Sequence, residues 1–477
     1  MSVLLESLVR FEWAVLAYFA VVNGWTLMLL VGATLEMRRH AGLQRDERWR
    51  LPGSPLAPSI TVLAPVRNEM ETVIDRVAAL LALHHRNLEV VVVDDGSSDR
   101  TLDVMREHFH LVGVHPIYRR SIVTAPVRAL YRSAVYPNLV VVDKVHGGKA
   151  DALNAGLNVA MGELVCAIDA GTLVENEALQ CMVRPFLERD DVLATGGTIR
   201  IANGCVIRNG RVADARVPRH PLAAFQVVEY LRTYLFGRLG WNRLGGNIVM
   251  SGAFGLFRRE AVIDVGGYAH DTVVEDMEMV LRLRRRGHET GGPHRVVFVP
   301  DPVAWTQAPT STPALGRERE RWHRGLADAL WRHRAVLMHA RYGALGLVVF
   351  PFILVMELLA PVVELLGVLG LALGLSLGVL DGAFAGLFLI VAYALGAVLT
   401  VFTLVMDELS FARYTRLSDR ARLVFWALIE PIGYRQLTVF WRLQGLERWL
   451  RRKRTPGRAV PSGPGSASGV EHVRGAA

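Results

Sequence analysis

Long apolar runs lie towards both ends of the chain and enclose a region of mixed character. Residues 13–35 are almost continuously apolar, close to the ~20 residues that a helix needs to cross the hydrocarbon core. Further apolar regions cover about 344–380 and 383–406. The stretch 423–441 is apolar but interrupted by charged residues and flanked by arginines, a pattern typical of a helix lying in the membrane interface. We therefore expect three membrane spans, with four as the alternative.

Between residues 58 and 334, short β-rich runs alternate with helical patterns. The predicted strands are Ile60–Val66, Leu88–Val93, Leu139–Val142, Leu164–Ile168 and Val192–Thr198, and the predicted helices are Glu69–Leu83, Thr101–His108, Lys149–Ala160 and Asn176–Glu188. This alternation predicts an α/β fold with a mostly parallel sheet and helices on both faces. Ligands of such sheets bind beyond the carboxyl ends of the strands, so the residues that follow each strand are the candidates for function.

Basic residues gather beside the apolar runs. They are Arg38, Arg39, Arg45, Arg48 and Arg50 after the first run, and Arg451 to Arg454 near the end. Such residues usually mark the cytoplasmic side, so we expect a multi-pass protein of the cell membrane with its middle region in the cytosol. The expected segments are 1–57 (a spanning helix at about 13–35 and a basic linker), 58–334 (the α/β domain), 335–442 (spanning and interfacial helices) and 443–477 (a basic and then disordered tail).

The charge pattern and the cysteines argue against a nucleic-acid-binding protein and against a protein held together by disulfides or a cysteine-bound metal. The net charge is +9, but no basic stripe is interleaved with aromatic residues, so nucleic acid is not an expected partner. Cys166, Cys181 and Cys205 form no close pair and show no metal-ligand spacing. A reducing compartment without a disulfide framework is the simplest interpretation.

Carboxylates follow the first two predicted strands. The first strand leads into Pro65-Val66-Arg67-Asn68-Glu69, and the second ends at Asp94 and Asp95. Adjacent carboxylates repel each other, so their place at a strand end indicates hydrogen bonds to a nucleoside or contact with a cation. A turn or helix cap is the structural alternative.

The next two strands lead to a lysine and a further carboxylate. Gly147-Gly148-Lys149 begins a predicted helix that also carries Asp151. Backbone N–H groups and an ammonium at a helix start favour phosphate, although the sequence is not a P-loop. Asp169 follows the strand Leu164–Ile168, where one carboxylate can hold Mg²⁺ or Mn²⁺ together with phosphate oxygens and water.

Two clusters lie further along the chain. Glu275 and Asp276 open a helix predicted to run to about Arg286, where carboxylates are favourable for the helix alone. The second cluster, Arg317–Gly325, combines arginines that can hold a pyrophosphate with Trp322, whose indole can stack on a sugar ring. A solvated helix face with i,i+4 ion pairs is the alternative.

The order of these motifs closely resembles family 2 glycosyltransferases of the GT-A fold, and in particular the membrane-integrated synthases of cellulose, chitin, hyaluronan and poly-N-acetylglucosamine. The resemblance covers roughly Pro58 to Gly325, and the flanking apolar runs match the layout of that group. It implies an inverting transferase that moves a sugar from a nucleotide-sugar, expected to be a UDP-sugar, to a growing polysaccharide or other saccharide acceptor, with a β-linkage in the product.

The resemblance also implies roles for single residues. The donor-nucleotide side comprises Pro65, Glu69, Asp94, Asp95, Lys149 and Asp151; the metal ligand is Asp169; the catalytic base is Asp276; the acceptor and pyrophosphate side comprises Glu275, Glu318, Arg321 and Trp322. Two positions depart from the family pattern, since Gly171 replaces a second metal-binding Asp and Glu318 replaces a Gln.

These departures keep other functions open. A degenerate relative would bind a nucleotide-sugar or a partner protein without catalysis, and a single-transfer enzyme would act on a lipid carrier.

The expected partners are the donor, a saccharide or lipid-linked acceptor and membrane lipid. Three spans enclose at most a narrow channel, which leaves room for an export or assembly partner. The aromatic segment Phe225–Gly246 is either an amphipathic element near the membrane entrance or part of the ordinary core.

Overall fold

The computed structural model describes residues 2–45, 57–169, 171–208, 210–245, 247–248, 250 and 254–451 of the 477-residue chain. Two sets of residues considered above lie outside these ranges: the linker arginines Arg48 and Arg50, and the tail from Arg452 onward.

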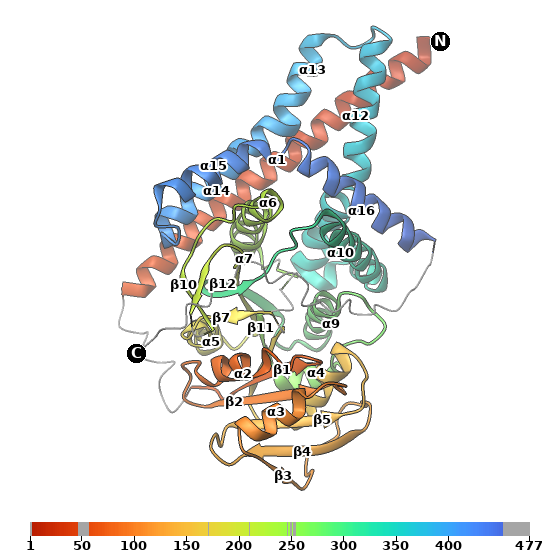
Figure 1. Cartoon of the computed structure of the whole chain (residues 1–477). Helices are drawn as coiled ribbons and strands as arrows, with labels where there is room; N and C mark the ends of the chain where they lie inside the picture. Colours follow the sequence, from red (N-terminus) through yellow and green to blue (C-terminus); the bar gives the residue numbers. More distant parts are fainter. Residues whose placement is uncertain are drawn as a thin grey trace.

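A large mixed sheet forms the centre of the region between the apolar segments (Figure 1). Its strands are β1 (Ile60–Val66), β2 (Leu88–Asp94), β3 (Leu111–Val114), β4 (Val127–Ser133), β5 (Leu139–Lys144), β6 (Leu164–Ile168), β7 (Leu173–Val174), β8 (Val192–Ile201), β11 (Phe254–Arg258) and β12 (Arg295–Thr306). Among the described residues, their order is β3-β4-β5-β2-β1-β6-β11-β8-β12-β7. The central strands β5, β2, β1 and β6 are parallel, which confirms the expected α/β fold.

Helices cover both faces of the parallel strands. On one side lie α2 (Val73–Leu81) and α3 (Thr101–His108), and on the other lies α4 (Lys149–Val159). Side chains of β1 alternate between the two cores, with Val62 and Ala64 in one and Leu63 in the other. Because these strands are buried on both faces, their sequences are continuous apolar runs without polar alternation. The helix predicted from Glu69 begins four residues later, at Val73.

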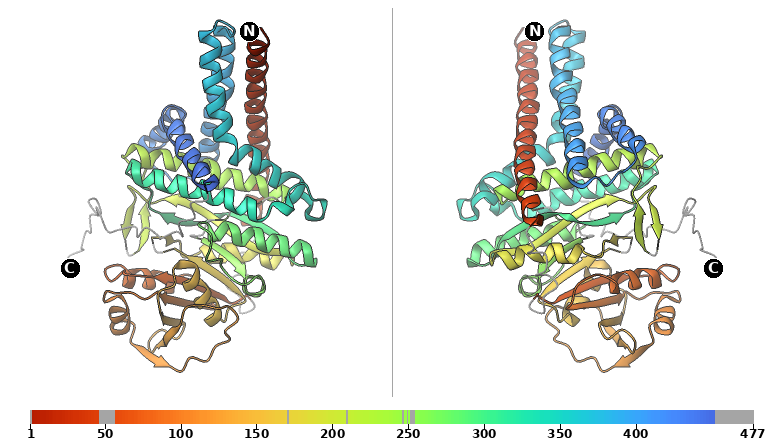
Figure 2. Two further views of the ribbon diagram at one scale, coloured as in Figure 1. Left: turned by 90° about the vertical axis from the view of Figure 1, so that its right-hand side faces the viewer. Right: turned by 90° about the vertical axis from the view of Figure 1, so that its left-hand side faces the viewer.

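A second layer of helices separates the sheet from the projecting helices of the membrane part (Figure 2). The remaining elements are α1 (Ser2–Arg45), α5 (Ala178–Glu188), β9 (Val206–Arg208), β10 (Arg211–Asp214), α6 (Pro221–Tyr230), η2 (Leu231–Gly237), α7 (Arg238–Leu244), α8 (Arg259–Asp264), α9 (Glu275–Thr290), α10 (Thr312–Arg332), η3 (Arg334–Val336), η4 (Ala340–Tyr342), η5 (Leu345–Val349), α11 (Phe350–Phe352), η6 (Ile353–Leu358), α12 (Ala360–Ser376), α13 (Gly382–Leu389), η7 (Ile390–Ala394), α14 (Leu395–Phe411), α15 (Leu417–Ile429) and α16 (Tyr434–Leu450). The layer contains α6, α10, α15 and α16, while α1, α12 and the continuous helix Gly382–Phe411 (α13, η7 and α14) extend away from it.

Two helices in the described part of the chain are long and apolar enough to cross a membrane. They cover Val3–His40 and Gly382–Phe411. A third candidate is a pair of helical segments, Leu345–Leu358 and Ala360–Ser376, bent by 45°. Pro361, in the first turn of α12, removes a backbone donor next to this bend. The chain is therefore a membrane protein with two candidate spans, or three if the bent pair forms one.

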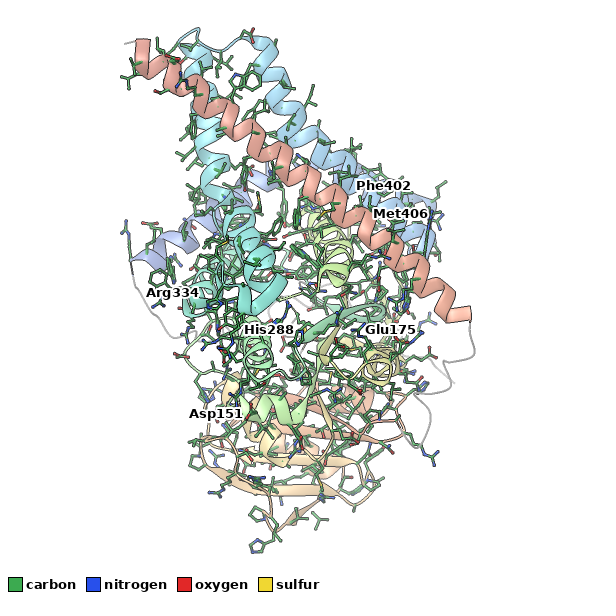
Figure 3. The ribbon with its side chains drawn as sticks, turned by 180° about the vertical axis from the view of Figure 1, so that it is seen from behind. Asp151, Glu175, His288, Arg334, Phe402 and Met406 are labelled. Carbon is green, nitrogen blue, oxygen red and sulfur yellow. The ribbon has the colours of Figure 1, made fainter. Side chains whose placement is uncertain are left out.

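The sheet and the membrane helices share one hydrophobic core. Leu30 and Ala33 of α1 and Leu404 of α14 belong to the same buried cluster as the apolar side chains of β1 and β2. A buried ion pair adds a polar link, because Arg200 at the end of β8 donates to Asp407 of α14 at 2.5 and 3.1 Å. Figure 3 shows the neighbouring residues Phe402 and Met406 on α14 beside α1.

Candidate active site

Four parallel strands bring the predicted site residues to one edge of the sheet. Val66 at the end of β1 pairs with Asp94 of β2, and Asp94 pairs with Asp143 of β5. Asp169 follows directly after β6, the other neighbour of β1. The segments predicted to bind the donor nucleotide and the metal therefore lie side by side, although far apart in sequence.

Asp95 is buried and organises the turn before α4. One carboxylate oxygen accepts hydrogen bonds from Lys144 Nζ at 2.7 Å and from the N–H of Gly147 at 2.9 Å. The other accepts the N–H of Gly148 at 2.8 Å and lies 2.7 Å from His146 Nδ1. Asp95 thus fixes the backbone that leads into Lys149. Its predicted contact with the nucleoside stays a prediction.

Lys144, which none of the motifs indicated, connects two of the residues predicted to bind the donor. Its ammonium group is fully buried and lies 2.7 Å from Asp95 and 2.5 Å from Asp151. Asp151 also accepts the N–H of Ala125 at 3.0 and 3.2 Å. The available signal was the charged pair Asp143-Lys144 at the end of a strongly apolar strand, because a charge in such a place needs a partner.

The ends of β1 and β6 are held together by Arg76 of α2, a second residue that the motifs did not indicate. Its guanidinium donates to Glu69 at 2.8 Å, to the Pro65 carbonyl at 3.4 Å and to the Ile168 carbonyl at 3.2 Å. Glu69 and Pro65 are therefore engaged within the protein in this structure. Arg76 also fixes the backbone immediately before Asp169.

Asp94, at the end of β2, is bound within its own turn. Its carboxylate accepts hydrogen bonds from the backbone N–H and the hydroxyl of Ser97. Burial raises the pKa of Asp94, and the hydrogen bonds from Ser97 act in the opposite direction. The turn that the sequence analysis kept as the structural alternative is thus present, and a nucleoside contact of Asp94 stays a prediction.

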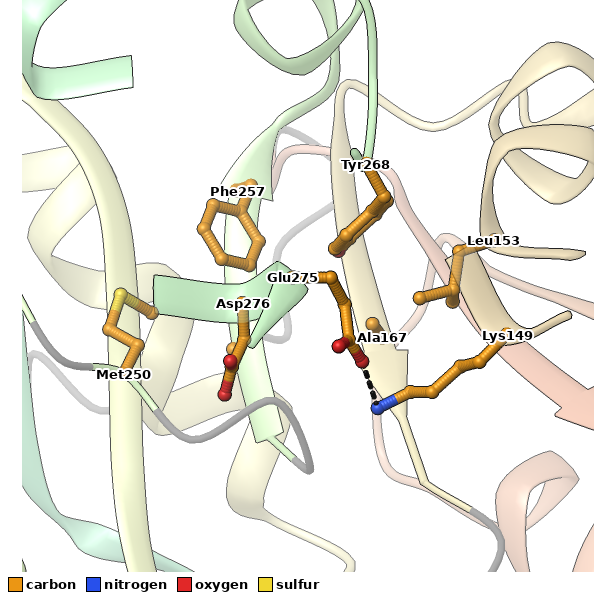
Figure 4. A pocket seen from close by; sticks show the side chains of 9 residues that line it. Lys149, Leu153, Ala167, Met250, Phe257, Tyr268, Glu275 and Asp276 are labelled. Carbon is orange, nitrogen blue, oxygen red and sulfur yellow. Dashed lines mark ion pairs between the residues drawn. The ribbon is translucent and has the colours of Figure 1, made fainter. Parts of the chain in front are cut away.

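Lys149 connects the predicted metal-binding carboxylate with the beginning of helix α9 (Figure 4). Its ammonium group lies 2.7 Å from Asp169, after β6, and 2.8 Å from Glu275, at the start of α9. Burial alone would lower the pKa of Lys149, but the two carboxylates outweigh it and raise the pKa. Lys149 is therefore a permanent positive charge at the point where the donor diphosphate is predicted to lie.

Asp276 lines a small pocket beside this lysine. The other lining residues are Lys149, Leu153, Ala167, Met250, Gly255, Phe257, Tyr268 and Glu275. Burial and the negative charge of Glu275 raise the pKa of Asp276, while Lys149 acts against them. A carboxylate with a raised pKa at the wall of a pocket has the properties required of a general base.

The cluster on α10 is less exposed than an ordinary surface helix. Arg319 is buried, donates to Glu229 at 2.8 Å and lies 3.6 Å from Glu318. Its guanidinium also lies over the Trp322 ring at 4.5 Å. Arg319 therefore offsets the charge of Glu318 and already covers Trp322. Arg321 is exposed. Burial would raise the pKa of Glu275, but the charge of Lys149, with a smaller contribution from Arg321, lowers it.

The donor set at Asp169 fits a weakly held divalent cation. The Asp169 side chain is 38% exposed, and the described residues contain no group of three or more His, Cys, Asp or Glu side chains that could hold a metal by themselves. Mg²⁺ is often bound through one or two carboxylates together with substrate phosphates and water. A β-carbon on Gly171 would meet nothing within 4 Å, so a side chain could begin there without a clash.

Family models identify the class of protein to which this site belongs. The model described as glycosyl transferase family 2 matches residues 61–266, and the model described as glycosyl transferase family group 2 matches residues 164–404. The second match alone spans half of the chain. The chain therefore belongs to the family 2 glycosyltransferases, which confirms the resemblance seen in the motifs.

Curated relatives include the poly-β-1,6-N-acetyl-D-glucosamine synthase of Staphylococcus aureus (strain COL). It is 27% identical over 274 residues, which cover 57% of this chain and 56% of the relative. The Staphylococcus epidermidis protein with the same name is 26% identical over the same length. The match thus spans little more than half the length of these curated relatives.

The solved structures that resemble this chain are less similar to it in sequence than the staphylococcal proteins are. The mannosyltransferase PcManGT from Pyrobaculum calidifontis, in complex with GDP-Man and Mn²⁺, has a TM-score of 0.48 at 19% identity and covers 87% of this chain and 99% of its own. S. aureus TarS 1–349 has a TM-score of 0.38 at 14% identity, with coverage of 79% and 91%. Because both scores are below 0.5, the fold assignment rests on the strand order and the family models.

Proposed function

We propose that this protein is an inverting glycosyltransferase that moves a sugar from a UDP-sugar to a saccharide acceptor at the cytosolic face of the cell membrane. The observation that carries the proposal is the position of Asp276 in the same pocket as Lys149 and Glu275. The names of the staphylococcal relatives support an N-acetylhexosamine as the sugar and a growing polysaccharide as the acceptor. The arginines after the first span support a cytosolic site in a multi-pass protein.

In the proposed mechanism, Asp276 accepts the proton of an acceptor hydroxyl as its oxygen attacks the anomeric carbon of the donor. The bond from that carbon to the diphosphate oxygen breaks, and the nucleoside diphosphate leaves with the bonding electrons. Attack from the opposite face inverts the configuration, so an α-linked donor gives a β-linked product. Lys149 and Arg321 stabilise the negative charge that develops on the leaving group.

A divalent cation, Mg²⁺ or Mn²⁺, bound at Asp169 would neutralise further charge on the diphosphate. Asp95 and Lys144 hold the turn that carries Lys149, and Arg76 holds the backbone before Asp169. These contacts fix the site before a donor arrives, so little reorganisation is required at the moment of reaction.

The test is nucleotide release by the purified full chain in detergent, across UDP- and GDP-sugars with Mg²⁺ or Mn²⁺. We expect release with one donor and a fall of at least ~100-fold in Asp276→Asn, the scale of general-base loss. Asp264→Asn, which removes an exposed carboxylate on α8, is the matched control and should retain activity. Near-normal turnover in Asp276→Asn would disprove the assignment. Nucleotide binding without release by the wild type would instead favour a non-catalytic relative.

A further inference from the structure

A second cavity lies where the first membrane helix meets the sheet. It has a volume of about 300 Å³, at the lower end of the range for small-molecule sites. Side chains of α1, α5 and α7, of the residue after α5 and of the first half of β12 form its wall. Among the described residues, the lining of this cavity and the lining of the Asp276 pocket have no member in common. The two cavities are therefore separate sites.

The second cavity lies towards the edge of the sheet opposite to the proposed catalytic residues. Strand β12 is parallel to β8, β8 is antiparallel to β11, and β11 is antiparallel to β6. Strands β12 and β6 therefore run in the same direction and begin at the same edge. Arg295, the first residue of β12, lines the cavity, whereas Asp169 follows the end of β6. A ligand in this cavity would thus take no direct part in the proposed reaction.

Arginine is the most frequent residue in the wall of the cavity. Two of these arginines are engaged by carboxylates close in sequence, because Arg184 donates to Glu188 at 2.6 Å and Arg189 donates to Asp191 at 2.8 and 2.9 Å. The capacity of the cavity for a ligand therefore depends on the other three. The five arginines and the two carboxylates that line the cavity are Arg39, Arg184, Arg189, Arg243 and Arg295, with Glu36 and Glu188.

The other three arginines come from three different elements and keep donors for a ligand. Arg39 on α1 is exposed and has no ion-pair partner within the described part of the chain. Arg243 on α7 lies 3.7 Å from Glu36, which is longer than a hydrogen bond. Arg295 on β12 donates its Nε to Asp191 at 3.2 Å. A guanidinium has five N–H donors, so most donors of these three groups are left for a ligand.

A phosphate group matches these donors. Guanidinium groups bind phosphate through two parallel hydrogen bonds, and groups from three elements can surround its oxygens. Glu36 and Glu188 would repel a bare anion but can accept hydrogen bonds from hydroxyl groups next to the phosphate. Val297 and Val299 add apolar surface to the wall. The combination favours a phosphate ester that carries hydroxyl groups or an apolar part.

The end of a membrane helix brings one source of such a phosphate close to the cavity. The candidate span Val3–His40 ends at the cavity wall. Met28, Val31 and Leu35 precede Arg39 at intervals of three or four residues and therefore share its face of α1. They are 43%, 53% and 42% exposed, so acyl chains can lie along this face. Arginines at the end of a span also attract anionic phospholipids.

We propose that the cavity between α1, α7 and β12 binds a phosphate group through Arg39, Arg243 and Arg295. The phosphate belongs either to the headgroup of an anionic phospholipid or to a phosphate ester in solution. Because the three arginines come from different elements, a bound phosphate connects the membrane helix α1 with the sheet and should stabilise the full chain. The inference does not depend on the proposed function, since no step of the reaction uses this site.

The test measures binding to the purified full chain in detergent micelles. One arm titrates phosphatidylglycerol, with diacylglycerol as the matched lipid without phosphate, and the other arm titrates glycerol phosphate. Native mass spectrometry counts bound lipid, and the rise in unfolding temperature reports both ligands. We expect Arg243→Gln and Arg295→Gln each to weaken binding about 10-fold, the scale of a lost charge-assisted hydrogen bond.

The matched control is Arg286→Gln on α9, which lies outside the cavity. Arg286 is 49% exposed and Arg243 is 48% exposed, and each has one carboxylate partner, so both substitutions remove the same charge from a similar environment. We expect Arg286→Gln to bind the ligands as the wild type does. Arg39→Gln changes an exposed residue and provides the same test if either of the other cavity variants fails to fold.

The two arms distinguish the two sources of the phosphate. Binding of phosphatidylglycerol that exceeds that of diacylglycerol and weakens in the cavity variants supports a lipid headgroup. Binding of glycerol phosphate with the same dependence, without such binding of the lipid, supports an ester in solution. Three results would overturn the inference: no saturable binding of either ligand, equal binding by the wild type and the cavity variants, or an equal loss of binding in Arg286→Gln.

Discussion

Gly325 of α10 lies directly against the side chain of Val274, the residue before Glu275 and Asp276. A β-carbon on Gly325 would overlap both methyl groups of Val274. The absence of a side chain at Gly325 therefore lets α10 approach the beginning of α9. The position of the proposed base depends on this close contact.

Gly325→Ala should move the N-terminus of α9 and lower turnover more than stability. An alanine in a helix interior is favoured over glycine by about 1 kcal/mol, whereas overpacking typically costs about 1–3 kcal/mol. We expect a small loss of thermal stability with at least a ~10-fold loss of kcat, since an error in positioning lowers the rate strongly. The control is Gly386→Ala in α13, where a β-carbon meets nothing within 4 Å. Unchanged kcat in Gly325→Ala would contradict this role.

The pH dependence of kcat/KM should reflect the raised pKa of Asp276. A general base must be ionised, so activity is lost as the pH falls through a pKa above the usual 3.8. Glu275→Gln removes a negative charge that raises this pKa, and the acidic limb of the profile should move to lower pH. Glu260→Gln removes an exposed carboxylate on α8 and should leave the limb in place. A limb that moves to higher pH in Glu275→Gln would be inconsistent with the proposed electrostatics.

Gly171→Asp should strengthen metal binding. The open space at Gly171 can take a side chain, and a second carboxylate adds both charge and a ligand. We expect the Kd for Mn²⁺ in the presence of UDP to fall about 10-fold, since ligand charge is a main determinant of affinity at oxygen sites. Electron paramagnetic resonance of free Mn²⁺ measures this directly. Gly171→Ala controls for the change in backbone freedom, and equal affinity in both variants would argue against Asp169 as a ligand.

Lys144→Met should destabilise the protein much more than the loss of a nearby surface ion pair. It leaves Asp95 and Asp151 buried without their cation, a change that typically costs about 3–5 kcal/mol. Arg128→Met breaks the Arg128–Asp143 pair, in which the arginine is 51% exposed, and should cost less than about 1 kcal/mol. Unfolding in detergent compares the two. Lys144→Met should also raise the donor KM, because the Gly147-Gly148 turn loses its anchor.

The parallel part of the sheet could be predicted because its strands have a simple signature. Strands β1 and β6 have the predicted bounds, since a doubly buried strand must be apolar along its whole length and polar residues mark its ends. The antiparallel strand β11 lacked such a signature. Its place between β6 and β8 depends on contacts between segments that are distant in sequence.

The motifs selected Lys149 and Asp276, which the structure places in the wall of one pocket, but not the residues that support them. Both were selected because strand and helix ends concentrate reactive groups, and their roles stay predictions. Lys144 and Arg76 were missed, since each acts through partners that only folding brings close. Conversely, Trp322 was expected to offer its ring to a sugar, but Arg319 lies over that ring in this structure. A single sequence does not reveal which neighbour covers an aromatic face.

The ion pair between Arg200 and Asp407 bears on how this enzyme can be handled in the laboratory. A fragment cut after residue 334 would leave Arg200, which is 2% exposed in the full chain, without its carboxylate and would strip the apolar side chains of α14 from the sheet. Such a fragment should aggregate on expression. Harsh detergents that unfold α14 should likewise inactivate the catalytic half, so the choice of lipid mimetic decides whether activity can be measured at all.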